Sequence, residues 1–246
     1  MSRPVKKVLV FLLVLFVLVP VGLRILGEPS GPVAYGMMLL DPYVKPADAP
    51  AYYTLHYRLR SLYFDLWPDP ADPVVFFGDS ISHEGDWDSL FPGVHALNRG
   101  ISGDTTRGLL NRQSEVIGLR PRAIFLLIGT NDLCFGRPVD QVAVNYRQIL
   151  ERFKKELPQT KVYVQSVLPI NEQMYPARSY RNNKNIEALN PEIRKAAEDY
   201  GYTWIDIAPA FRDPSNQLDV RLTSDGLHLS ERGYRVWKDK IAAFVK

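Results

Sequence analysis

The sequence predicts an α/β protein in which helices cover both faces of a five-stranded parallel sheet. Three observations predict it. From residue 73 onward, short apolar runs alternate with longer amphipathic stretches. The runs are almost continuously apolar, which is typical of parallel strands buried on both faces. Polar clusters follow the first three runs directly.

The elements follow from periodicity. Amphipathic segments repeat their apolar residues at helical spacing, most clearly over residues 139–157, and a further helix ends at Gly201. The strands are expected at Val74–Phe77, Val94–Leu97, Ala123–Ile128, Val162–Val167 and Thr203–Ile207. The helices are expected at residues 51–67, from near residue 105, and at residues 139–157, 183–200 and 230–245.

Ahead of this domain, residues 1–26 predict a membrane anchor. Three cations precede an apolar run from Val8 to Leu23, at the short end of what crosses a bilayer. The run also fits a signal peptide, but no small-x-small cleavage pattern lies just beyond it. The positive-inside rule places the N-terminus in the cytoplasm and the rest in the periplasm or outside the cell. Residues 27–72 are expected to form a linker and a leading amphipathic helix, and residues 73–246 the α/β domain.

Composition narrows the classes of function. The net charge is only +3, without the basic stripe that nucleic-acid binding needs. Cys134 is the only cysteine, so an intrachain disulfide or a cysteine-based metal site is excluded. The four histidines show no paired metal-ligand spacing. We expect neither a metal nor another cofactor, and the oligomeric state stays open.

The polar clusters define one site if the strands are ordered suitably. "GDS", "NRGISGDTT" and "GTND" follow the first, second and third strands. Ligands of open parallel sheets bind outside the carboxyl ends of the strands. In a flavodoxin-like order, 2-1-3-4-5, the first strand lies between the second and third. The three loops would then be neighbours in space.

Ser80 in "GDS" is the candidate nucleophile. A serine needs a base to remove its proton, commonly a histidine that a carboxylate orients. "SDGLHLS", just before the last helix, supplies Asp225 and His228 from one loop. An oxyanion would be stabilised by the backbone N–H groups of Ser80 and Gly103 and by the side-chain amide of Asn131.

Several residues have plainer interpretations. Asp79 and Asp132 are expected to be structural, through hydrogen bonds to loop N–H groups, and Asp104 to cap the helix that begins near residue 105. Cys134 is expected to be a small apolar filler. The fifth position of the serine motif is Ser82 rather than glycine, which argues against an α/β-hydrolase nucleophile elbow.

With these residues in place, the sequence resembles the SGNH hydrolases, also called the GDSL esterase/lipase family. Four blocks carry the resemblance, in order: "FGDSIS", "NRGISGDTT", "IGTND" and "SDGLHLS". The resemblance implies Ser80 as nucleophile, His228 as base and acid, and Asp225 as its partner. It implies an oxyanion hole from Ser80, Gly103 and Asn131. The stretch after the serine is similar to the subgroup around platelet-activating factor acetylhydrolase and to bacterial carbohydrate acetylesterases.

The expected function is a serine esterase that cleaves short-chain, acetyl-type esters of a carbohydrate or lipid through an acyl-serine intermediate. Two alternatives use the same triad: transfer of the acyl group to a glycan, and a lysophospholipase-type lipase. A glycan-binding module without catalysis is disfavoured because the whole catalytic set is present. His83 and Arg107 lie near the site in sequence, with no assigned role.

Overall fold

The computed structural model describes residues 50–66, 71–176 and 180–245. The chain divides into two compact units, Met1–Trp67 and Pro68–Lys246. In the first unit, the described residues form helix α4, Leu55–Leu66. The predicted anchor at residues 1–26 lies outside the described residues. Within them, no helix combines the length and apolar character needed to cross a bilayer.

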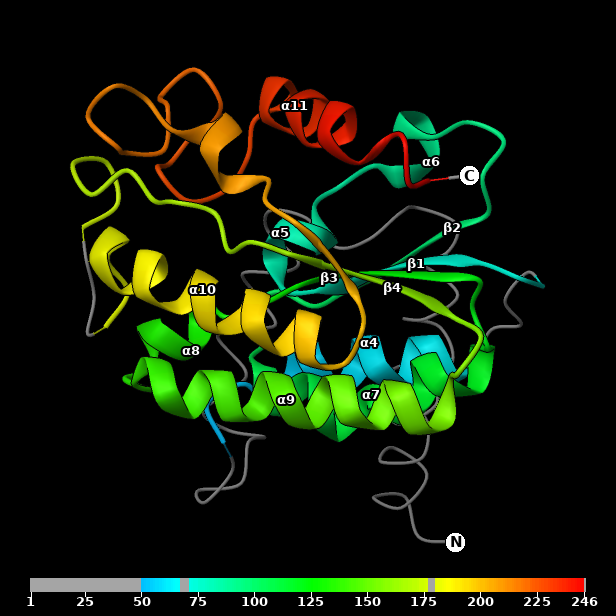
Figure 1. Ribbon diagram of the computed structural model, residues 1–246. Coiled ribbons are helices and arrows are strands. Elements are labelled where there is room, and N and C mark those ends of the chain that lie inside the picture. Colours follow the sequence, from blue (N-terminus) through cyan, green and yellow to red (C-terminus); the bar gives the residue numbers. More distant parts are fainter. Residues whose placement is uncertain (1–49, 67–70, 177–179, 246) are drawn as a thin grey trace, which may run out of the picture. The chain divides into compact units, whose positions relative to one another are not determined.

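The second unit is a three-layer α/β fold (Figure 1). Its five parallel strands are ordered β2-β1-β3-β4-β5, which confirms the predicted order. The strands are β1 Val74–Gly78, β2 Ala96–Gly100, β3 Ala123–Leu127, β4 Lys161–Gln165 and β5 Thr203–Ile205. The helices are α5 Ser80–His83, α6 Trp87–Leu90, α7 Thr106–Leu119, α8 Thr130–Cys134, α9 Val139–Glu156, α10 Asn183–Asp199, the 3-10 helix η2 Ala208–Phe211 and α11 Glu231–Ile241.

Alternate residues of each central strand enter two different cores, because successive side chains point to opposite faces of a sheet. Val75 and Phe77 of β1 pack among the side chains of α7, α9 and α10. Val74 and Phe76 pack instead with α6, η2 and α11. Figure 1 shows these two helical layers on opposite sides of the sheet. The continuous apolar runs in the sequence follow from this double coverage.

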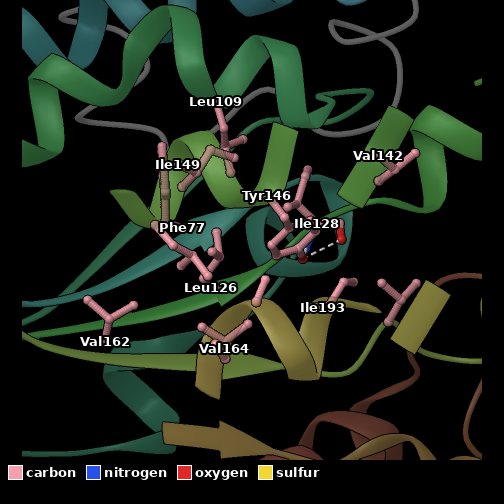
Figure 2. Close-up of a cluster of buried hydrophobic side chains, with 14 of the residues drawn as sticks. Phe77, Leu109, Leu126, Ile128, Val142, Tyr146, Ile149, Val162, Val164 and Ile193 are labelled. Carbon is pink, nitrogen blue, oxygen red and sulfur yellow. Dashed lines mark hydrogen bonds between the residues drawn. The ribbon is translucent and has the colours of Figure 1, made fainter. Parts of the chain in front are cut away.

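The hydroxyl of Tyr146 makes two hydrogen bonds within the core formed with α7, α9 and α10. The Tyr146 hydroxyl is fully buried between α9 and the end of β3. It donates to the carbonyl of Ile128 at 2.6 Å and accepts from the Ile128 N–H at 3.2 Å (Figure 2). A buried hydroxyl without partners would cost about 1–3 kcal/mol. This pair therefore fixes the carboxyl end of β3, from which the next loop departs.

The predicted strand at Val94–Leu97 begins and ends too early. The observed β2 runs from Ala96 to Gly100 and pairs in register with β1 from Val74 to Gly78. Asn98 is a polar residue within this strand. Its side-chain amide donates hydrogen bonds to the carbonyls of His83 and Gly85. These bonds hold the segment after β1 against β2.

Candidate active site

Ser80 stands at the first position of α5, directly beyond the carboxyl end of β1. Asp79 caps this helix, because its Oδ1 accepts the N–H of Ile81 at 3.0 Å. The turn requires glycine at position 78. A Cβ there would lie 2.2 Å from the carbonyl oxygen of Leu127 in β3. Close approach of β1 and β3 thus fixes the point at which the chain turns and presents Ser80.

The structure brings Ser80, His228 and Asp225 together. His228 Nε2 lies 3.0 Å from Ser80 Oγ, and His228 Nδ1 lies 2.7 Å from Asp225 Oδ2. A carboxylate at Nδ1 favours the tautomer that carries its proton there, so Nε2 is left to accept the serine proton. This is the geometry that activates a serine for attack on an acyl carbon.

The loop that carries Asp225 and His228 is held by its own hydrogen bonds. Asp225 Oδ1 accepts the N–H groups of Leu227 at 2.9 Å and His228 at 2.7 Å. Thr223 Oγ1 accepts from the N–H of Gly226 and donates to the carbonyl of His228. Partial burial raises the pKa of Asp225, but the bonds from the His228 side chain and from the Leu227 and His228 N–H groups outweigh burial. The net pKa is lowered, which keeps the carboxyl ionised beside the imidazole.

The three predicted oxyanion donors follow three neighbouring strands. Gly78, at the end of β1, pairs with Gly100 of β2 and with Leu127 of β3. Ser80 and Gly103 lie two and three residues beyond those ends of β1 and β2, and Asn131 lies in α8 after β3. Gly103 has a φ of +81°, which a side chain would strain.

Each candidate donor is held in its own way. Ser80 is the first residue of a helix, where the N–H has no intrahelical acceptor. Gly103 occupies a turn closed by the Asp104 N–H donating to the carbonyl of Ile101. Asn131 is anchored by one amide N–H that donates to the carbonyl of Asp104 at 3.0 Å. No other hydrogen bond from this amide is found among the described residues.

Three buried carboxyls lie beneath these loops: Asp79, Asp104 and Asp132. Burial raises the pKa of Asp79 to about 7, although the Ile81 N–H and His228 oppose it. Burial likewise raises the pKa of Asp104 to about 7, although the nearby Arg112 guanidinium lowers it. Burial also raises the pKa of Asp132. The Oδ2 atom of Asp79 is buried, and no group in the described ranges donates to it.

The network around these carboxyls ties the loops together. Arg112 of α7 binds Asp104 at 2.8 Å and donates to the carbonyls of Gly78 and Arg99, next to the ends of β1 and β2. Asp132 accepts the N–H and hydroxyl of Thr106 at 2.8 and 2.7 Å. Asp79 and Asp132 do accept backbone N–H groups, as expected, but these belong to the first turns of α5 and α7 rather than to loops.

The expectation that Asp104 caps α7 is wrong. Thr105 is the cap, since its hydroxyl accepts the N–H of Gly108, and Asp104 faces Arg112 instead. Thr105 lies directly after Asp104, so the sequence does not distinguish the two as caps. Cys134, expected to be a small apolar filler, is half-buried.

Two further side chains lie beside the site: Glu84, which sequence reasoning missed, and His83, which it placed near the site without a role. Glu84 Oε1 lies 3.9 Å from His228 Nε2. His83, to which the sequence assigns no role, brings its Nδ1 to 2.8 Å from the hydroxyl of Ser102, next to Gly103. Both residues lie within four positions of Ser80. This closeness in sequence is the only feature by which the sequence indicates that they lie near the site.

Comparison with known proteins gives a consistent result. Residues 76–236 match the GDSL-like Lipase/Acylhydrolase family. The human platelet-activating factor acetylhydrolase IB subunit alpha1 is 31% identical over 188 residues, covering 74% of this chain and 77% of the relative. The bovine subunit alpha2 is 31% identical over 172 residues, covering 68% and 72%. The crystal structure of a GDSL-like lipase from Bacteroides thetaiotaomicron superposes with a TM-score of 0.66 at 26% identity, covering 77% of this chain and 96% of the other.

Proposed function

The chain belongs to the GDSL-like lipase/acylhydrolase family, and on that premise we propose that it hydrolyses short-chain esters through an acyl-serine intermediate on Ser80. The observation that carries the proposal is the unbroken relay from Asp225 through His228 to Ser80. A hydrolase activity follows from the family itself. The acetyl preference is supported by the relatives named acetylhydrolases.

Acylation begins when Ser80 Oγ attacks the carbonyl carbon of the ester. His228 Nε2 takes the serine proton as the new C–O bond forms, and Asp225 stabilises the imidazolium. The carbonyl oxygen gains negative charge. Hydrogen bonds from the N–H groups of Ser80 and Gly103 and from the Asn131 amide stabilise this charge. The imidazolium then returns its proton to the departing alcohol oxygen, and the acyl group remains on Ser80.

Deacylation repeats these steps with water as the nucleophile. Water loses a proton to His228 Nε2 and attacks the acyl carbon, and the same donors stabilise the second oxyanion. The Ser80 oxygen leaves with the proton from Nε2, which releases the carboxylic acid. Each proton taken by His228 is returned within the same half-reaction.

Labelling with a fluorophosphonate tests this proposal, because the probe reacts readily with an activated serine hydroxyl. We expect the label on the peptide that contains Ser80, and no label in Ser80→Ala. Ser114→Ala is the matched control, because this exposed serine of α7 lies outside the site. Labelling that persists in Ser80→Ala, or hydrolysis of p-nitrophenyl acetate at the parental rate, would contradict the assignment.

We also propose, from the sequence alone, that residues 1–26 anchor the enzyme with its catalytic domain on the periplasmic or outer side of the membrane. The three cations ahead of the apolar run support this orientation. Protease protection in intact and permeabilised spheroplasts tests it. Digestion of the domain only after permeabilisation would contradict the orientation.

A further inference from the structure

A groove lies between the segment that follows α5, including part of α6, and helix α11. Its volume is about 550 Å³, within the range of sites for small molecules. Glu84, Asp86 and Ser89 line one wall, and Glu231 and Lys238 of α11 line the other. None of these residues takes part in the reaction steps above.

Two residues of the lining, Glu84 and Leu229, place the groove beside His228, which is not itself part of the lining. Leu229, the residue after His228, lines the groove. Glu84, from the opposite wall, places Oε1 3.9 Å from His228 Nε2. Nε2 is the atom that returns the proton to the departing alcohol, so the alcohol oxygen must lie beside it. The rest of the alcohol can then extend into the groove beside it.

The groove carries charges of both signs. Glu84 and Asp86 contribute carboxylates, Lys238 contributes an ammonium group, and Glu231 pairs with Arg235 within α11. An anionic or cationic group would meet like charge on some part of this lining. A neutral molecule with several hydroxyls finds acceptors in the carboxylates and donors in the cations.

A quaternary ammonium group would meet carboxylates here, but no open aromatic face among the described residues of the lining. Recognition of such groups typically relies on open aromatic faces. Among the described residues of the lining, Tyr234 is the one aromatic, and it is only 8% exposed. Its hydroxyl donates to the carbonyl of Ile81 at 2.9 Å, which turns its polar end away from a ligand. The lining thus favours hydroxyl groups over a choline-like head.

Glu84 is available to such a hydroxyl. Its side chain is 46% exposed, and no group in residues 50–66, 71–176 and 180–245 donates a hydrogen bond to it. Burial raises the pKa of Glu84, with His228 opposing that shift. Hydrogen bonds to a charged acceptor are typically stronger than those between neutral groups, so one hydroxyl can be held firmly at Glu84.

We propose that this groove binds the alcohol part of the ester, that the alcohol is an uncharged polyhydroxylated unit such as a sugar, and that Glu84 accepts a hydrogen bond from one of its hydroxyls. The proposal rests on the esterase function and adds the class of leaving group. The groove directs a hydroxyl-rich alcohol away from Ser80 along α11, whereas the acyl group stays at the oxyanion donors.

Three acetate esters of unactivated alcohols test the proposal: 6-O-acetylglucose, ethyl acetate and acetylcholine. The parent enzyme is expected to show the highest kcat/KM for the glucose ester. In Glu84→Gln, the ratio of kcat/KM for the glucose ester to that for ethyl acetate should fall about tenfold, mainly through KM. Lys238→Ala, a second and independent variant, should lower the same ratio. Glu192→Gln, on the exposed face of α10, is the control and should keep the parental ratio.

The outcomes separate the two proposals. Equal losses for the glucose ester and ethyl acetate in Glu84→Gln would mean that Glu84 acts through His228, which overturns the alcohol site. A preference of the parent for acetylcholine or ethyl acetate would overturn it as well. Absence of turnover of all three esters by the parent would instead overturn the esterase function.

Discussion

His228 Nε2 lies 3.0 Å from Ser80 Oγ, although 148 positions separate the two residues along the chain. Parallel strands make this contact possible, because every β-strand delivers its following loop to the same edge of the sheet. Ser80 follows β1, and the His228 loop comes after η2 and just before α11. The site is therefore assembled by the topology of the sheet rather than by proximity in sequence.

Asp225→Asn should lower kcat by up to about 10⁴-fold with little loss of stability. The amide keeps an oxygen for the N–H groups of Leu227 and His228, so the loop stays in place. It also offers a donor to His228, which favours the wrong tautomer. Steady-state kinetics with p-nitrophenyl acetate and a thermal melt check both parts. A fall in Tm that matches the fall in kcat would point to loop disruption instead.

Asn131→Ala should reduce kcat by about 10²–10³-fold, with a smaller change in KM. The amide contributes more to the charged oxyanion than to the neutral ester, so its removal affects the transition state most. The measurement is kcat and KM over a range of substrate concentrations. Asn145→Ala, in α9, serves as a comparison because its amide binds Thr106 Oγ1 rather than facing the oxyanion. Equal losses in the two variants would contradict the assignment.

Asp79→Asn should become more stable relative to the parent as the pH rises from 4 to 8. The Asp79 carboxyl ionises near 3.8 in the unfolded chain and near pH 7 in the folded protein, because burial disfavours its charge. The stability that it contributes is complete below the lower value and is lost as the pH rises through the higher one. Asparagine does not titrate and can still accept the Ile81 N–H.

Urea midpoints at pH 5, 6, 7 and 8 check this dependence. Asp239→Asn, on the exposed face of α11, is the control. Part of the slope should remain in Asp79→Asn, because burial also raises the pKa of Asp104 and Asp132. A constant difference between parent and Asp79→Asn across this range would contradict the prediction.

Gly78→Ala should destabilise the protein by about 3 kcal/mol or more. The added methyl would overlap the backbone carbonyl of Leu127 and the hydroxyl of Ser82, and the backbone contact cannot relax without separating β1 from β3. Gly118→Ala is the matched control, since nothing lies within 4 Å of its Cβ position in α7. That control should gain about 0.5–1 kcal/mol. Chemical denaturation measures both values.

The parts predictable from sequence are those that a one-dimensional pattern determines. Phe77 and its neighbours form a continuous apolar run because β1 is buried on both faces. The expected flavodoxin-like strand order places the three polar clusters at adjacent strand ends, and the observed order agrees with it. The motifs indicate Ser80, Asp225, His228, Gly103 and Asn131, and the fold brings the first three into contact. The chemical roles of all five stay predictions.

The parts that sequence reasoning misses depend on partners far away along the chain. Arg99 is buried in a strand that reads as a polar loop, so apolar periodicity places β2 too early. Arg112 looks like an ordinary helix cation, yet it reaches Asp104 and two strand ends. Glu84 acquires its significance only from the position of His228. No local rule indicates such contacts, because they exist only after the layers pack.

His228, the proposed base, lies in a loop near the end of the chain, so it is synthesised long after Ser80. At about 5–20 residues per second, a ribosome needs about 7 to 30 seconds to add the 148 residues between Ser80 and His228. Throughout that interval the nascent chain carries Ser80, the proposed nucleophile, without His228, its proposed base. The proposed esterase site is therefore complete only after the loop before α11 has been synthesised.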